Sequence, residues 1–346
     1  AIPFPNDPST YPDNDWVDLV LGPALIYNAD ISVSGATDNV NYYTSFNYFN
    51  QEGIVKSSGL EKYIFRSNLD IKISDKIKAG FRVNYSRLEQ DNALASYSQA
   101  AFGILRTQPV YNADGSFNGF NDVVGSPFSN PLANIALNTN ETFENNLLAT
   151  AFLEYKPAEN WIIRSTFSPE FNNTKRNIFR SSQAPDLLSV GDTGQGSASV
   201  RTVNSTGWNN ENTIQYNTDI NDHHSITALA GASFQKSSTE IAEAEAFGIT
   251  SDATGFNSLG NSDPTRSVVS SSFSGFQIAS FFGRLNYTYK DKYLFTLVGR
   301  TDGSSRFATG NKYEFYPSVA AAWKISEEPF MENQDVVKDL KLRASW

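Results

Sequence analysis

The feature that most constrains the fold of this chain is the alternation of apolar and polar residues over long stretches. It is clearest in residues 27–35, 63–73, 77–86 and 279–290, where one set of alternate residues is apolar and the other is polar. Successive side chains of a β-strand point to opposite faces, so each stretch predicts a strand with one apolar face and one polar face. A short strand of the same kind is expected at 340–345. The fold class expected is therefore all-β.

The predicted strands are long for a water-soluble protein. Several extend over about ten residues or more, whereas strands of globular proteins average about 5–6 residues and a tilted membrane-spanning strand needs about 9–11. Aromatic residues gather towards the strand ends on the apolar face: Tyr63, Phe65, Tyr287, Tyr289, Tyr293, Phe295, Tyr313 and Phe315. Transmembrane β-barrels carry such aromatic girdles at both lipid–water boundaries. Length and girdle together predict a transmembrane antiparallel up-and-down β-barrel.

The links between the predicted strands alternate in length. Short links are expected at 36–39, 74–76, 157–160, 218–222 and 290–292. Long links, rich in Gly, Ser and Asn, are expected at 51–62, 91–142, 173–205, 235–275 and 302–312. Outer-membrane barrels have short periplasmic turns and longer external loops, whereas a soluble β-sandwich, the alternative for any single strand, has no reason to sort its links. The pattern predicts about twelve strands of an up-and-down barrel, with the three longest links as external loops.

Composition excludes several classes of protein. Of the 346 residues 40% are hydrophobic and 13% aromatic, so the chain is not expected to be disordered. It has no run of about 20 apolar residues that would predict a membrane helix. The formal net charge of −10 argues against a nucleic-acid partner, which needs a basic surface. Cysteine is absent, so no disulfide and no thiolate metal site is expected.

Three motifs near the end of the sequence closely resemble the SusC/RagA-like family of TonB-dependent outer-membrane transporters. They are GRTDGSSRF (Gly299–Phe307), FYPSVAAAWKISEEPFM (Phe315–Met331) and LKLRASW (Leu340–Trp346). Earlier segments are similar to the early barrel and to the first long external loop of that family: Asp15–Val20, Ile31–Asp70, Lys76–Arg87 and Gln108–Phe117. The resemblance spans nearly the whole chain in the order of the family.

The resemblance implies a fold and a function. Barrels of this class have about 22 strands around a plugged lumen. Residues 1–346 are therefore expected to be one segment of a transmembrane barrel domain, about half of it, without the plug domain and the remaining strands. The implied function is TonB-dependent import of large nutrients, such as oligosaccharides or peptides, across the bacterial outer membrane. No enzymatic activity and no cofactor are implied.

The resemblance also implies the partners of the protein. A SusD-like surface lipoprotein would act as a lid on the external side, and TonB would act through the missing N-terminal region. The other implied partners are outer-membrane lipids and a polar oligomeric cargo.

Three other functions stay open at this point. A barrel of about twelve strands could close alone as a passive porin or a surface adhesin. A soluble all-β carbohydrate enzyme or binding module is a weaker alternative. A transporter-like barrel could also serve as a docking component of a larger envelope complex.

The sequence offers little for catalysis or metal binding. His223 and His224 are the only histidines, and adjacent residues of a strand point to opposite faces, so they would chelate a metal poorly. Residues 111–117 lack the ligand spacing of a calcium loop and are interpreted as a turn. The glutamates of 240–245 are interpreted as a solvated face or short helix of an external loop. No catalytic, cofactor or metal site is predicted.

Charged residues on the polar strand faces are the main functional candidates. The alternation places eight of them on the face opposite to the apolar one: Arg66, Asp70, Lys72, Arg82, Arg284, Arg300, Lys324 and Arg343. In a barrel this face lines the lumen. There the charges would dock the plug, solvate the pathway or hydrogen-bond a polar cargo.

One loop and several aromatic residues complete the candidates. Asp302, Gly303 and Arg306 belong to the first of the three motifs, and an ion pair among Arg300, Asp302 and Arg306 is expected to hold this loop. The aromatic residues assigned to long loops would stack on sugar rings or pack the loops together: Tyr97, Tyr111, Phe120 and Trp208.

Overall fold

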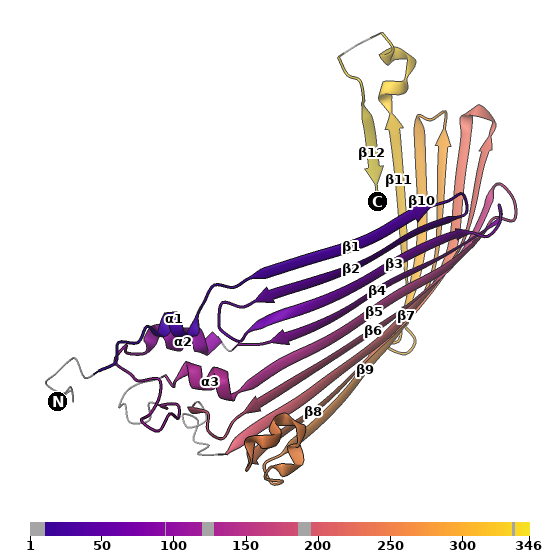
Figure 1. Ribbon diagram of the computed structural model, residues 1–346. Helices are drawn as coiled ribbons and strands as arrows, with labels where there is room; N and C mark the ends of the chain where they lie inside the picture. Colours follow the sequence, from indigo (N-terminus) through magenta and orange to yellow (C-terminus); the bar gives the residue numbers. More distant parts are fainter. Residues whose placement is uncertain (1–10, 94, 120–127, 186–194, 334–335) are drawn as a thin grey trace.

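A computed structural model describes residues 11–93, 95–119, 128–185, 195–333 and 336–346. These residues form one twelve-stranded antiparallel sheet, in which each strand pairs with its neighbours in the sequence (Figure 1). The strands are β1 (Ile26–Ala36), β2 (Val40–Glu52), β3 (Gly59–Lys72), β4 (Ile77–Asp91), β5 (Thr139–Tyr155), β6 (Trp161–Arg180), β7 (Gly196–Ile220), β8 (His224–Ile249), β9 (Val268–Tyr289), β10 (Tyr293–Ser304), β11 (Tyr313–Lys324) and β12 (Lys341–Ser345). The predicted all-β fold and its up-and-down strand order are confirmed.

The pairing register aligns the apolar faces of successive strands. One apolar row crosses six strands through Ile31, Phe46, Phe65, Tyr85, Leu147 and Phe171. Directly paired residues share a face of the sheet. The next row along the strands holds Ser45, Arg66 and Asn84, and it belongs to the opposite, polar face. The two faces predicted from the alternation are therefore confirmed.

No second layer covers the apolar face in the part of the chain that the structure describes. Large side chains on this face remain exposed, for example Ile31 (71%), Phe65 (40%) and Phe295 (47%). The buried apolar clusters are small, and they lie at the strand ends, around Trp16 and around Phe179. Exposed apolar surface of this extent marks an interface, and for a two-faced sheet of long strands that interface is lipid.

An aromatic row borders the apolar face at the end where the short links lie. His224, Tyr289, Tyr293 and Trp323 follow one another across the strands, with ring centroids 4.9, 6.2 and 6.3 Å apart. Glu328, from the link after β11, accepts hydrogen bonds from Tyr293 Oη at 2.6 Å and from Trp323 Nε1 at 2.9 Å. Aromatic rings with polar tips suit a lipid–water boundary. Two of its members, Tyr289 and Tyr293, belong to the girdle predicted from the sequence, whereas His224 and Trp323 were not predicted.

The links from β1 to β11 alternate in length as predicted, but several predicted loop bounds are wrong. The link 325–340 between β11 and β12 breaks the alternation, because it lies at the short-link end and is longer than the long links 53–58 and 305–312. The long links are 53–58, 92–138, 181–195, 250–267 and 305–312, so the loops predicted at 91–142, 173–205 and 235–275 are too wide. Strands β6, β7, β8 and β9 continue into outer segments that carry polar residues on both faces, which hides the alternation. The glutamates of 240–245 consequently lie in β8 rather than in a helix or loop.

Short helices lie at the ends of the sheet. At the long-link end, α1 (Trp16–Val20) lies beside α2 (Ala95–Gly103) and α3 (Pro131–Leu137), which belong to the link between β4 and β5. Figure 1 shows this group beyond the ends of β1–β6. The remaining short elements are 3-10 turns: η2 (Asn221–His223), η3 (Asp252–Asn257), η4 (Leu259–Asn261), η5 (Ile325–Glu327) and η6 (Pro329–Met331).

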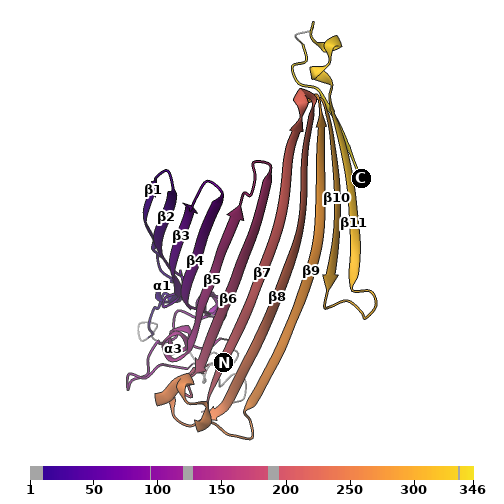
Figure 2. The same ribbon diagram turned by 90° about the vertical axis from the view of Figure 1, so that its right-hand side faces the viewer.

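The sheet is a curved wall with two edges. Figures 1 and 2 show it twisting so that its early and late strands run in different directions. Strands β1 and β12 form the edges, and among the described residues each pairs on one side only. A sheet edge within a bilayer would leave backbone groups without partners, so this wall is part of a larger barrel. No helix among the described residues is both long and apolar enough to cross a membrane.

Candidate functional site on the polar face

The register places all eight predicted charged residues on the polar face, but it does not gather them at one point. Asp70 and Arg82 meet on β3 and β4, whereas Arg284, Arg300 and Arg343 are spread over β9, β10 and β12. Three of the eight are exposed and form no ion pair with any described residue: Arg66, Arg284 and Arg343. Their predicted contacts with a plug or cargo stay predictions.

A compact group of charges and one aromatic ring lies on the polar face of β3–β6. Arg82 donates to both carboxylate oxygens of Asp70, at 3.1 and 3.2 Å. The guanidinium groups of Arg82 and Arg164 lie 5.1 and 4.0 Å from the centre of the Phe152 ring. Arg164 is also 3.7 Å from Glu154. We call these five residues the Phe152 clamp. Both of its cations contact one ring, and each faces a carboxylate.

Glycine at position 80 makes room for the Phe152 clamp. Gly80 pairs directly with Asp70 on one side and with Phe152 on the other. A Cβ atom at this position would lie 2.1 Å from Phe152 Cε1 and 2.5 Å from Asp70 Oδ1, so both of these side chains would have to move. Phe152 and Arg164 were not predicted from the sequence. A glycine inside an otherwise regular strand pattern was the available signal, since it marks a close approach.

The predicted ion pair at the start of the β10–β11 loop forms between two of its three expected members. Arg300 Nε lies 2.8 Å from both carboxylate oxygens of Asp302. Arg306 is not part of this pair, and its guanidinium lies 4.6 Å from the centre of the Phe276 ring on β9. Gly303 pairs with Tyr313, whose ring occupies the space of a Cβ atom. The ion pair lies within β10, so the loop itself is held by the contact of Arg306 with the Phe276 ring.

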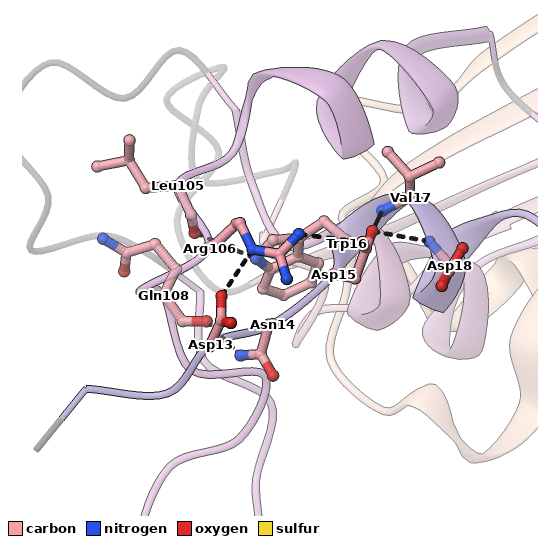
Figure 3. Close-up of polar contacts among 9 residues, drawn as sticks. All are labelled: Asp13, Asn14, Asp15, Trp16, Val17, Asp18, Leu105, Arg106 and Gln108. Atoms are coloured by element: carbon pink, nitrogen blue, oxygen red, sulfur yellow. Dashed lines mark hydrogen bonds and ion pairs between the residues drawn. The ribbon is translucent and has the colours of Figure 1, made fainter. Parts of the chain in front are cut away.

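An arginine joins the N-terminal segment to the 92–138 link at the long-link end of the sheet (Figure 3). Arg106 donates from Nε to Asp13 at 2.6 Å and from Nη1 to Asp15 at 3.0 Å. Asp15 also caps α1 by accepting from the backbone N–H groups of Val17 and Asp18. The hydrogen bond from Arg106 lowers the pKa of Asp13, and the amide of Asp18, followed by Arg106, lowers the pKa of Asp15.

A small apolar cluster around Trp16 packs next to the ion pairs of Arg106. Trp16 is 2% exposed, packs with Ala100 and Ile104, and donates from Nε1 to the carbonyl oxygen of Leu105 at 3.2 Å. The amide of Asn14 donates to a backbone carbonyl further along the same link. The N-terminal segment and the 92–138 link therefore form one small subdomain at the long-link end of the sheet.

The aromatic residues expected in the loops have different positions. Tyr97 is buried in α2, and the ring of Tyr111 lies 5.1 Å from that of Phe117 across a tight turn. Trp208 lies on the apolar face of β7, so its assignment to a loop is wrong. Phe120 lies outside the described residues.

The two histidines lie at the short-link end. His223 belongs to the turn η2, and His224 Nδ1 is 2.7 Å from Tyr287 Oη. Within the described ranges, no group of three His, Asp or Glu residues is placed to hold a metal ion.

A twelve-stranded wall with an uncovered apolar face and a charged polar face has the structure of part of a transmembrane β-barrel. Comparison with known proteins identifies its family. The family model described as "TonB dependent receptor-like, beta-barrel" matches residues 95–346. The chain belongs to the TonB-dependent receptor β-barrel family.

Individual relatives agree with this assignment. TonB-dependent receptor P26 of Formosa agariphila is 70% identical over 346 residues, which are 100% of this chain and 35% of that protein. TonB-dependent receptor SusC of Bacteroides thetaiotaomicron is 28% identical over 372 residues, covering 96% of this chain and 34% of that protein. The chain spans about a third of the length of these curated relatives.

The fold is also found in solved structures. The structure of the RagAB peptide transporter matches with a TM-score of 0.79 at 21% sequence identity, over 96% of this chain and 38% of the other. The RagAB peptide importer in the "closed-closed" state matches with a TM-score of 0.81 at the same identity, over 96% of this chain and 37% of the other.

Proposed function

We propose that this chain is a segment of the barrel wall of a TonB-dependent importer in the bacterial outer membrane. The importer takes up large nutrients, such as oligosaccharides or peptides. The main evidence for this proposal is that one face of the sheet is apolar and uncovered, while the other face is polar and bears charged side chains. Lipid suits the first face and a water-filled lumen suits the second. The kinship with TonB-dependent receptors, SusC among them, supports energised rather than passive transport.

The mechanism needs no covalent chemistry. Cargo binds at the long-link end, a lid closes over it, and TonB displaces the plug so that the cargo crosses along the polar face. The Phe152 clamp and the exposed arginines Arg66, Arg284 and Arg343 dock the plug and solvate the pathway. Charges in a lumen act at short range on a polar solute, which is why they are arranged along its wall.

The lid of this importer is a SusD-like lipoprotein that docks at the long-link end. The external subdomain around Arg106 and the η3–η4 link offer fixed surfaces there, because buried clusters pack beneath both. A stable lid complex needs more than about 1,000 Å² of buried surface, which several loops together supply.

Uptake by cells that carry the full-length gene tests this proposal. Fluorescently labelled oligosaccharides and peptides from the growth medium of the host are supplied with and without TonB. Uptake through this protein should stop when TonB is deleted or a protonophore is added. Uptake that continues without TonB would identify a passive porin, and normal growth and uptake after deletion of the gene would favour a docking component.

A further inference from the structure

Two arginines face each other on the polar face, near the long-link end of β6 and β7. Arg176 and Arg201 are directly paired across the two strands. Like charges directly opposite each other destabilise a sheet. Arg201 lies 3.6 Å from a carboxylate oxygen of Glu243, but Arg176 donates from Nε to the neutral amide oxygen of Asn140, at 3.1 Å. The described carboxylates therefore offset one of the two charges.

The same arginine lines a cavity with further positive charge. The cavity has a volume of about 380 Å³ and lies between the ends of β5 and β6 and the helices α2 and α3. Lys56, Arg176 and Arg180 line it, and Asp91 is the single carboxylate among its lining residues. Lys56 Nζ donates to the backbone oxygen of Asp18, so no carboxylate offsets its charge. The volume lies within the range of small-molecule sites, about 300–1,000 Å³.

The other carboxylates nearby are not among the residues that line the cavity. Glu61, Glu89 and Glu141 lie on the opposite face of β3, β4 and β5, and Glu141 is paired directly with Asp91. Glu144 shares the polar face of β5, where it accepts hydrogen bonds from the side-chain amides of Asn146 and Asn172. Glu245 shares the polar face but lies on β8, two strands away from Arg176. The cavity itself thus keeps an excess of positive charge.

The side chains of the cavity suit an oxyanion carried by a hydroxyl-rich molecule. A guanidinium offers five N–H donors in a planar fork, which binds a carboxylate or sulfate through two parallel hydrogen bonds. Asn92, Asn138 and Asn140 add neutral amide groups to the lining, and such groups exchange hydrogen bonds with sugar hydroxyls. An acidic peptide would use the arginines but not this set of amides.

We propose that the cavity around Arg176 binds a carboxylate or sulfate group of the cargo, so that the imported oligosaccharide is anionic. Lys56 and Arg180 contribute further positive charge from the lining of the cavity. The inference rests on the proposed function of an importer and specifies the chemical class of its cargo.

Calorimetric titration of the purified full-length protein, with its lid, tests the cargo class. The probes are a tetragalacturonate with its methyl ester, and a sulfated galactan tetrasaccharide with its desulfated form. At least one of the two anionic sugars should bind at least about tenfold more tightly than its neutral partner, as expected for charge-assisted hydrogen bonds. The two pairs separate a carboxylate site from a sulfate site. A tetraglutamate peptide serves as the competing class.

Two variants test the residues. Arg176→Gln and Arg180→Gln should each weaken binding of the anionic sugar about 10- to 100-fold and leave the neutral sugar unaffected, because both arginines line the cavity. Lys175→Gln is the matched control, because Lys175 is the next residue on β6 but lies on the opposite face. Arg176→Gln should also leave the midpoint of thermal unfolding unchanged or raised without ligand, since it removes the repulsion between paired arginines.

The outcomes separate this inference from the proposed function. Equal affinity for anionic and neutral sugars, unchanged binding in both arginine variants, or tighter binding of the peptide would overturn the anionic-sugar site while TonB-dependent uptake stands. Absence of TonB-dependent uptake of any labelled sugar or peptide would overturn the importer itself.

Discussion

Gly80 is the residue on which the Phe152 clamp depends, because it lies directly between Asp70 and Phe152 in the sheet. Gly80→Ala should push the Phe152 ring away from its two arginines and lower the free energy of unfolding by about 1–3 kcal/mol, as overpacking does. Urea unfolding of the full-length protein in detergent measures this. Gly283→Ala is the control, since its added Cβ would meet the nearest atom at an ordinary 3.7 Å. An equal loss in both variants would contradict the role assigned to Gly80.

Glu328 ties the link after β11 to the aromatic row. Hydrogen bonds from Tyr293 and Trp323, and then the charge of Lys292, lower the pKa of Glu328 from its ordinary 4.5. Since the folded chain has the lower pKa, the stabilisation is complete above pH 4.5 and is lost as the pH falls through the lowered value.

The lowered pKa of Glu328 predicts how the stability of Glu328→Gln should depend on pH. At pH 7 the variant should unfold at a lower urea concentration than the wild type, and the difference should shrink as the pH falls well below the ordinary pKa of a glutamate. Unfolding midpoints measured from pH 7 to pH 3 test this. A difference that stays constant over the whole range would show that the charge of Glu328 does not stabilise the fold.

At the scale of elements, Arg106 holds α1 to the 92–138 link. Arg106→Ala should increase hydrogen exchange in 11–21 and 95–119 at least about tenfold while β1–β12 keep their protection, because the ion pairs join these segments and not the strands. Mass spectrometry of peptides from the full-length protein reports both regions. Arg87→Ala is the control, as Arg87 pairs with Glu89 within one strand. Unchanged exchange in the external segments would contradict the junction.

Strands with one apolar face were predicted from the sequence. Strand segments that are polar on both faces were not. The elements from β1 to β4 and from β9 to β12 were found because apolar and polar residues alternate in them. The outer parts of β6, β7, β8 and β9 were mistaken for loops, since polar residues occupy both of their faces. Backbone hydrogen bonding continues these strands, and it leaves no mark in composition.

Only part of the candidate site could be predicted from the sequence. Alternation within a strand tells which face a charge lies on, so the polar-face positions of Arg82 and Arg300 could be predicted. It does not tell which residues of neighbouring strands lie opposite each other, because that depends on the pairing register. The Phe152 clamp and the Arg176–Arg201 pair arise from the register, and for this reason neither was foreseen.

For the whole molecule, the central claim is that lipid covers the apolar face and water covers the polar face. The strand order, the uncovered aromatic residues and the family membership are all consistent with a wall that separates two solvents. A layer of protein over the apolar face, contributed by a part of the full-length protein outside this chain, would remove the reason for its composition.

Spin-label accessibility along β3 tests this claim most directly. Single cysteines are placed at successive positions from Tyr63 to Asp70 in the full-length protein, which is labelled and reconstituted in lipid bilayers; this segment has no cysteine of its own. Labels at Tyr63, Phe65 and Leu69 should collide mainly with oxygen dissolved in lipid, and labels at the alternate positions, including Arg66 and Asp70, mainly with a water-soluble nickel complex. Equal access of the nickel complex to both sets, or low access of both reagents at the apolar positions, would contradict the account.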